Sequence, residues 1–175
     1  MKKALILTGK FVQDHEFIYP YYRLKEEEFE VSVATEDGQE TVGALGTKIP
    51  VDSMVDEINP NDYNLLIIPG GAKAMEYMRQ NKKILNIITN WNKEGKVIAS
   101  ICHGSQLLIS AHVVKGRKIS GYYSIKDDIN NAGAIYIDAP FVVDNNIITS
   151  PHYKYLGPWM KEVLRVYGKY ENSNN

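Results

Sequence analysis

Two short apolar runs that stop at glycine-containing turns constrain the fold of this chain more than any other feature. Residues 65–68 read Leu-Leu-Ile-Ile and end at Pro69-Gly70-Gly71. Residues 97–101 read Val-Ile-Ala-Ser-Ile and lead into Cys102-His103-Gly104. Nearly continuous apolar runs of this length are typical of strands that are covered on both faces. The chain therefore predicts a buried, mostly parallel sheet.

Helical and extended patterns alternate around these two runs. Apolar residues at helical spacing predict a helix around residues 84–91 and a closing amphipathic helix that contains residues 159–166. Further expected elements are strands at 4–7 and 31–34, a helix at 16–28 with Pro20 in an early turn, a loose hairpin at 41–51 and a second hairpin at 135–149. Alternation of strands and helices predicts an α/β sandwich of three layers, with helices on both faces of the sheet.

Length and composition bear on the number of domains, the kind of partner and the cellular compartment. Its 175 residues fit a single domain, expected over 1–170, with a polar tail at 171–175 that we expect to be disordered. The net charge of -1 gives no electrostatic reason to expect nucleic acid or a membrane as partner. No signal-peptide pattern or long apolar segment is visible, and the single cysteine fits a reducing compartment. We therefore expect a cytoplasmic protein.

The strongest chemical signal is the thiol of Cys102 between a predicted strand and a predicted helix. Ligands of such sheets bind beyond the carboxyl ends of the strands, where residues 9–16, 69–72 and 102–104 should meet. A thiol at a helix N-terminus has a lowered pKa, and the N–H of His103 can serve as an oxyanion donor. The alternative is that Cys102 packs as a small buried apolar residue.

Other candidate residues give weaker signals when each is taken alone. Gly70 and Gly71 let backbone N–H groups approach a ligand, although Pro-Gly-Gly is also an ordinary turn. Glu16 enters a predicted helix, where an acidic residue is expected on dipole grounds alone. His152 follows a predicted strand and is either a base or pocket residue or an ordinary loop histidine. The four histidines show no metal-binding spacing, so no metal and no cofactor are expected.

Taken in order along the chain, these segments resemble the PfpI/ThiJ family, whose superfamily includes the parkinsonism-associated deglycase. The matching segments are Ile18-Tyr19-Pro20-Tyr21, Ile68-Pro69-Gly70-Gly71, Ala99-Ser100-Ile101-Cys102-His103-Gly104, Lys115-Gly116-Arg117-Lys118, Ile125-Lys126-Asp127-Asp128 and Asn131-Ala132-Gly133-Ala134. They cover nearly the whole chain and are most similar to the PfpI branch. The resemblance implies a flavodoxin-like sandwich, similar to class I glutamine amidotransferases, and a homo-oligomer, either a dimer or a hexamer.

The resemblance also implies roles for individual residues. Cys102 matches the nucleophile, His103 its adjacent histidine, and Glu16 the carboxyl group that hydrogen-bonds the sulfur. The amides of Gly71 and His103 match the oxyanion hole. The remaining expected substrate-binding residues are Gly70, Gly104, Tyr122 and His152.

Three departures from the family pattern bear on substrate choice. Gln13 stands where the PfpI branch usually has a second acidic residue. Glu76 is the candidate for the acid that a neighbouring subunit supplies to the histidine, but its alignment needs a one-residue insertion. The usual Ser-Arg after the last strand is Ser150-Pro151-His152 here, so the pocket should differ from that of relatives.

Three functions remain open on the sequence. The first is an enzyme that acts on small reactive carbonyls through Cys102 and Glu16, of the glutathione-independent glyoxalase or deglycase type. The second is an intracellular cysteine peptidase, amidohydrolase or hydratase that uses His103 as base. It ranks second because a histidine adjacent to the nucleophile should have difficulty in pointing back at it. The third is a non-enzymatic oxidation sensor or chaperone, since an exposed thiolate is readily oxidised.

Overall fold

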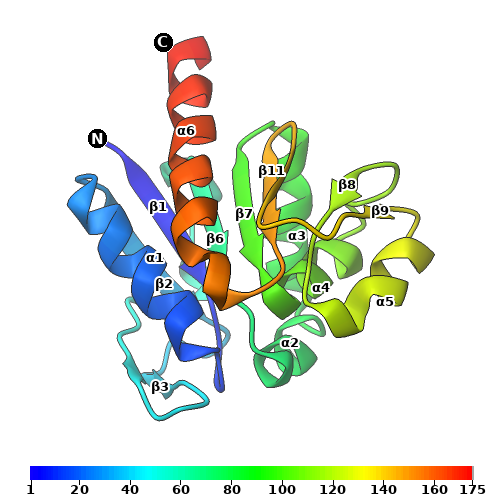
Figure 1. Ribbon diagram of the computed structural model, residues 1–175. Coiled ribbons are helices and arrows are strands. Elements are labelled where there is room, and N and C mark those ends of the chain that lie inside the picture. The colour runs from blue at the N-terminus through cyan, green and yellow to red at the C-terminus, as the bar shows by residue number, and fades with distance from the viewer. Residues whose placement is uncertain (175) are drawn as a thin grey trace.

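The computed structural model describes residues 1–174 and centres on a seven-stranded sheet (Figure 1). The strand order is β10-β11-β7-β6-β1-β2-β5, and every neighbouring pair is parallel except β10 with β11. The strands are β1 (Lys3–Leu7), β2 (Glu30–Thr35), β5 (Ser53–Met54), β6 (Leu65–Ile68), β7 (Val97–Ile101), β10 (Val142–Asp144) and β11 (Ile147–Ser150). The mostly parallel sheet predicted from the apolar runs is confirmed.

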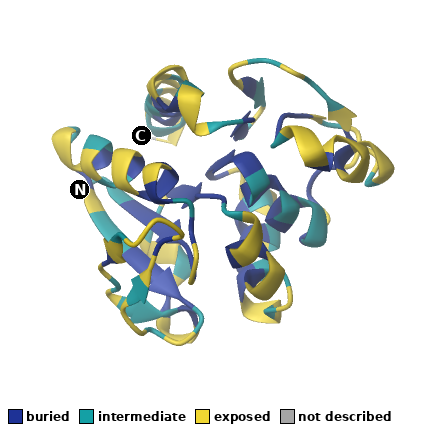
Figure 2. Cartoon of the chain, turned by 60° about the horizontal axis from the view of Figure 1, so that its bottom comes forward, coloured by how far each residue is buried: buried dark blue, intermediate teal, exposed yellow. Residues whose placement is uncertain are grey.

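Helices cover both faces of this sheet, because its central strands are apolar on both sides. Alternate residues of β1 enter different cores: Leu5 and Leu7 pack in one, Ala4 and Ile6 in the other. The first core is closed by α2 (Ala72–Met78), α3 (Lys82–Lys93) and α4 (Ser105–Ser110), and the second by α1 (Asp14–Glu26) and α6 (Leu156–Asn174). Figure 2 shows the buried strands between helices whose outer faces are exposed.

Two small strand pairs lie outside the main sheet. β3 (Thr41–Val42) and β4 (Lys48–Ile49) form the antiparallel hairpin expected within 41–51. The hairpin expected at 135–149 is wrong in its first part. β9 (Ile135–Tyr136) pairs in parallel with β8 (Lys118–Ile119), beside α5 (Lys126–Asn131), and the true hairpin is β10–β11. Pro140 lies between β9 and β10 and has no N–H to continue a ladder.

Two helices differ in detail from expectation. The first begins at Asp14 rather than 16, so Pro20 lies well inside it and not in an early turn. The last continues to Asn174, where we expected a disordered tail, and Tyr167 donates a hydrogen bond to Glu171 (2.7 Å) in this last part. Residue 175 of that tail lies outside the described residues. Within residues 1–174 no helix combines the length and apolar character needed to cross a bilayer.

Candidate active site

Cys102 occupies a sharp turn between β7 and α4. It opens a 3₁₀ turn, Cys102–Gly104, and its backbone φ is 59°, in the left-handed region that non-glycine residues rarely adopt. A strained strand-to-helix turn of this kind presents a nucleophile above the sheet in many α/β enzymes. Cys102 is only 6% exposed, so its side chain is buried and does not lie on an open surface.

Two glycines allow the neighbouring turns to pack tightly beneath the thiol. A Cβ atom on Gly104 would lie 2.6 Å from the carbonyl oxygen of Ile68. A Cβ atom on Gly70 would lie 2.5 Å from Oε1 of Glu16 and 2.9 Å from the amide nitrogen of His103. Both contacts are too short for a methyl group. Glycine at these positions therefore lets β6, β7 and α1 meet at a single point.

Glu16 is fully buried at that point, although it lies in the first turn of α1. Gln13 caps this helix, and its side-chain oxygen accepts hydrogen bonds from the amides of His15 (2.8 Å) and Glu16 (3.3 Å). Oε1 of Glu16 accepts a hydrogen bond from the amide of Gly70 at 2.8 Å. Oε2 is buried without a well-formed hydrogen bond among residues 1–174, and the Cys102 thiol is the polar group that faces this carboxyl.

Burial governs the ionisation of this pair. It raises the pKa of Glu16 to about 8, against weaker opposing effects from the Gly70 amide and the thiol. Burial, and next the negative charge of Glu16, also raise the pKa of Cys102, although the amides of His103 and Gly71 act in the opposite direction. The predicted lowering of the thiol pKa at a helix N-terminus is therefore wrong for the free protein, because desolvation outweighs the amide dipoles.

His103 does reach the sulfur. Its Nδ1 lies 3.5 Å from Sγ of Cys102, so the expected difficulty in pointing back at the nucleophile is not found. Burial lowers the pKa of His103, which favours the neutral imidazole. The ring stacks on Tyr122 at 4.7 Å between centroids, and the Tyr122 amide donates to the Cys102 carbonyl at 3.1 Å. Tyr122 thus holds both members of the Cys-His pair.

His152 joins the site as a hydrogen-bond donor. Its Nδ1 accepts a hydrogen bond from the Lys154 amide at 3.1 Å, which places the ring proton of the neutral form on Nε2. Burial, and then the charge of Lys154, lower the pKa of His152. Since one ring nitrogen is occupied and the other carries the proton, this geometry favours a pocket residue over a base.

Glu76 is not part of the site of its own chain. It lies exposed on α2, and its carboxylate pairs with the ammonium group of Lys73 at 2.8 Å. A role for Glu76 next to the histidine of a neighbouring subunit stays a prediction.

A cavity of about 550 Å³ opens above this arrangement. It brings together four residues expected from the sequence, Gly71, His103, Tyr122 and His152, while Cys102 and Glu16 lie beneath its floor. Its other lining residues are Phe11, Gln13, Ala44, Ala72, Lys73 and Tyr153. Phe11 and Tyr153 were not expected here, and no local sequence signal marks them, because they reach the cavity through loop conformation.

Asp14 is a further residue that the sequence reasoning missed. Its buried carboxylate accepts hydrogen bonds from the amides of Leu45 (2.7 Å) and Thr47 (2.9 Å), and so fastens the β3–β4 hairpin beside the site. Burial opposes its ionisation, but hydrogen bonds from Thr47 and Leu45 outweigh this and lower the pKa of Asp14.

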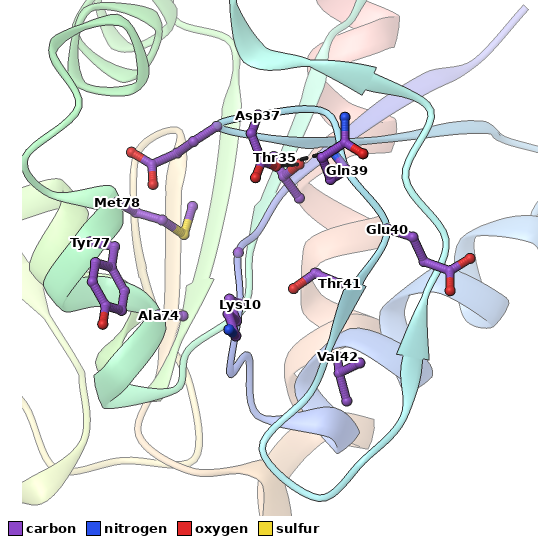
Figure 3. A pocket seen from close by; sticks show the side chains of 12 residues that line it. Lys10, Thr35, Asp37, Gln39, Glu40, Thr41, Val42, Ala74, Tyr77 and Met78 are labelled. Atoms are coloured by element: carbon purple, nitrogen blue, oxygen red, sulfur yellow. Dashed lines mark hydrogen bonds between the residues drawn. The ribbon is translucent and has the colours of Figure 1, made fainter.

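A second cavity, of about 590 Å³, is lined by Gly9 and Lys10, the residues that precede Phe11 of the first cavity (Figure 3). Its wall includes Lys10, Asp37, Glu40 and Tyr77, so it carries several charged side chains, whereas Lys73 is the one Lys, Arg, Asp or Glu that lines the first cavity. It holds none of the residues expected in the active site. No cluster of His, Cys, Asp or Glu within the described part of the chain could hold a metal ion.

Fold and site together define a flavodoxin-like α/β protein with a cysteine at a sharp strand-to-helix turn and a buried glutamate behind it. The family model described as DJ-1/PfpI family matches residues 2–166. The chain is 44% identical over 164 residues to Deglycase PfpI of Pyrococcus furiosus, which covers 94% of this chain and 98% of that protein. It is 33% identical over 170 residues to Protein/nucleic acid deglycase 2 of Escherichia coli, covering 95% and 98%. The chain therefore belongs to the DJ-1/PfpI family.

A solved structure supports the same assignment. The two-domain protein of Anabaena variabilis that contains DJ-1/ThiJ/PfpI-like and ferritin-like domains superposes with a TM-score of 0.92 at 34% identity. The match covers 96% of this chain and 48% of that one, so this chain spans about half of the two-domain protein.

Proposed function

We propose that this protein is a cysteine-dependent enzyme that acts on small reactive carbonyl compounds, of the glyoxalase or deglycase type. The observation that carries the proposal is the buried pair of Cys102 and Glu16 beneath a cavity that Gly71 and His103 line, with the amides of these two residues directed at the sulfur. Relatives that match nearly the full length of the chain are named deglycases, which supports this chemistry.

The first step is addition of sulfur to an aldehyde. The pair of Glu16 and Cys102 loses one proton before the other, and the remaining proton can sit on the carboxyl or on the thiol. With the proton on Glu16, the Cys102 sulfur is an anion and attacks the aldehyde carbon of a 2-oxoaldehyde. An S–C bond forms, the C=O π electrons move to oxygen, and that oxygen takes the proton of Glu16, which gives a hemithioacetal and leaves Glu16 as a carboxylate. The amides of Gly71 and His103 stabilise the charge on that oxygen.

The second step moves a proton between neighbouring carbons. The carboxylate of Glu16 removes the C–H proton of the former aldehyde carbon, and a proton returns to the adjacent keto carbon. The aldehyde carbon is thereby oxidised to a thioester and the keto carbon reduced to an alcohol, so no external oxidant is needed. Water hydrolyses the thioester, which gives a 2-hydroxy acid and the free thiol of Cys102.

With a glycated amine as substrate, only the first step differs. The former aldehyde carbon already bears an amino group and a hydroxyl, and the Cys102 sulfur displaces the amine, which leaves with the proton of Glu16. The product is the same hemithioacetal. A glyoxalase and a deglycase therefore need the same residues, Cys102 and Glu16, and differ only in the first leaving group.

The test is turnover of methylglyoxal by purified protein and by matched variants. We expect lactate from the wild type and none from Cys102→Ser or Glu16→Gln. Glu30→Gln is the control, because the Glu30 side chain is half exposed on β2 and forms a surface ion pair with Lys3 (3.3 Å). Absence of lactate from the wild type, or equal rates in Cys102→Ser, would contradict the proposal.

A cysteine peptidase or amidohydrolase is the second candidate, and one distance favours it. Nδ1 of His103 lies 3.5 Å from the Cys102 sulfur, and burial keeps the imidazole neutral, as a general base requires. In that case His103→Asn should abolish hydrolysis of a peptide and amide panel. The carbonyl reaction, which uses Glu16 for proton transfer, should be less sensitive to the same change.

We further propose that the active form is a homo-oligomer. The outer face of α1 carries the exposed side chains of Ile18, Tyr19 and Tyr22, an apolar surface typical of protein contacts. Light scattering on the purified protein should give a mass of at least twice 19.8 kDa, and a monomer would contradict this proposal.

A further inference from the structure

We propose that the cavity above Cys102 selects carbonyl compounds whose second substituent is a flat, uncharged aromatic ring. The inference rests on the proposed function for the reaction itself, but it concerns the group that the cavity holds beside the reacting carbon. Its basis is the lining of the cavity, half of which consists of ring side chains.

We call five of these side chains the ring wall: Phe11, His103, Tyr122, His152 and Tyr153. Three ring contacts join four of these side chains in series, in the order His103, Tyr122, His152 and Tyr153. Tyr122 stacks on His103 at 4.7 Å and lies 6.2 Å from His152, with both pairs inclined by 28°. Tyr153 follows at 4.1 Å from His152. The first two pairs are near parallel and the last is tilted by 43°, so the series forms a continuous aromatic surface along the cavity against which a flat guest can pack.

Phe11, a member of the ring wall, has a strained backbone conformation. Phe11 has a φ of 66°, which a bulky side chain rarely adopts, and its amide donates to the Val42 carbonyl at 3.0 Å. Its ring is nevertheless 37% exposed and lines the cavity, so burial in the core does not account for the conformation. Strained backbone residues cluster at ligand-binding sites, so the conformation of Phe11 fits a role in the ring-lined cavity.

The charge of the lining argues for an uncharged guest. Lys73 is the one Lys, Arg, Asp or Glu among the lining residues, and its ammonium group is paired with Glu76. The second cavity has the opposite character, since Lys10, Glu36, Asp37 and Glu40 all line it. A charged substituent would lose hydration in the ring-lined cavity without gaining a free counter-charge.

Size and donors complete the argument. A methyl substituent would leave most of a cavity of about 550 Å³ unoccupied, whereas a phenyl ring can lie against the ring wall. Because Nδ1 of His152 accepts from Lys154, the proton on its Nε2 is free to bind the keto oxygen of the substrate. The cavity therefore suits an aryl 2-oxoaldehyde better than its methyl counterpart.

The experiment compares phenylglyoxal with methylglyoxal in the wild type, in Tyr153→Leu and in Tyr77→Leu. Tyr77 is the matched control, because it is an exposed tyrosine of α2 that lines the second cavity. We expect Tyr153→Leu to lower the phenyl-to-methyl ratio of kcat/KM by about tenfold, mostly through KM, as loss of one ring contact implies. Tyr77→Leu should leave the ratio unchanged. An unchanged ratio in Tyr153→Leu would overturn the inference.

A binding measurement separates this inference from the reaction. In Cys102→Ser, ligand-observed NMR should detect acetophenone but not acetone, and Tyr153→Leu in the same background should weaken the acetophenone signal. If neither oxoaldehyde is turned over but acetophenone binds in this way, the proposed function fails and the ring-binding cavity stands. If both oxoaldehydes are turned over but acetophenone shows no preference over acetone, the ring-binding inference fails and the proposed function stands.

Discussion

Replacing Glu16 with glutamine should remove a pH-dependent cost in stability as well as slow the chemistry. Burial raises the pKa of Glu16 to about 8, whereas the ordinary value is 4.5. Between these values the unfolded chain releases the proton and the folded chain keeps it. The folded state then binds more protons than the unfolded state, so the free energy of unfolding falls as the pH rises through this window. Below pH 4.5 both states are protonated and the cost disappears.

The size of the effect follows from the same shift. One proton of difference corresponds to about 1.4 kcal/mol per pH unit. Between pH 5 and pH 7.5 the wild type should therefore lose about 3 kcal/mol through Glu16 alone. Glutamine does not titrate, and its carbonyl oxygen can accept the bond from the Gly70 amide that the carboxylate accepts at 2.8 Å. Any fixed cost of the new amide group cancels when each variant is compared with itself at two pH values.

The assay is urea unfolding of the wild type, Glu16→Gln and Glu30→Gln at pH 5 and pH 7.5. The stability difference between the two pH values should be about 3 kcal/mol smaller in Glu16→Gln than in the wild type. Glu30→Gln should behave like the wild type, since its carboxylate is half exposed. Parallel loss of stability in all three proteins would refute a raised pKa at Glu16.

Three more outcomes follow from the geometry. Alkylation of Cys102 by iodoacetamide, followed by mass spectrometry, should be slow at neutral pH and accelerate in alkaline solution, because burial raises the pKa of the thiol, and a rate independent of pH would contradict this. Gly70→Ala should abolish turnover and lower the melting temperature, because the new methyl group would lie 2.5 Å from Oε1 of Glu16, while Gly157→Ala, with open space around it, should do neither. Asp14→Ala should speed hydrogen exchange of the Leu45 and Thr47 amides and lower the free energy of unfolding by about 1–3 kcal/mol for each lost hydrogen bond. Acid should have a similar effect on exchange as the pH falls through the lowered pKa of Asp14.

The sheet could be predicted from the sequence because its signal is local. The apolar runs at Leu65–Ile68 and Val97–Ile101 need no partner to identify them as strands covered on both faces. The turns after them could be predicted for the same reason. The pairing of β8 with β9 could not, since it depends on which edge two-residue strands find in space.

The candidate site divides in the same way. The position of Cys102 between a strand and a helix marks it as a candidate in the sequence. For Glu16 the sequence pattern alone predicts no more than an acidic residue in the first turn of a helix. Its burial depends on how α1 docks against the turn at Gly70, which is a contact across 54 residues. Phe11 and Tyr153 reach the cavity through a left-handed residue and a short 3₁₀ turn, and neither has a residue pattern to mark it.

The raised pKa values of Cys102 and Glu16 are compatible with catalysis once the two groups are treated as one site. Burial penalises each charge, so the resting pair at neutral pH favours the fully protonated form. Removal of one proton creates a single negative charge, and its position on oxygen or sulfur depends only on where the remaining proton sits. In the proposed mechanism a carbonyl carbon above the sulfur takes up that charge in a new S–C bond, and the proton of Glu16 passes to the carbonyl oxygen. The burial that keeps the free thiol protonated at neutral pH is therefore compatible with the proposed attack on a carbonyl group bound in the cavity.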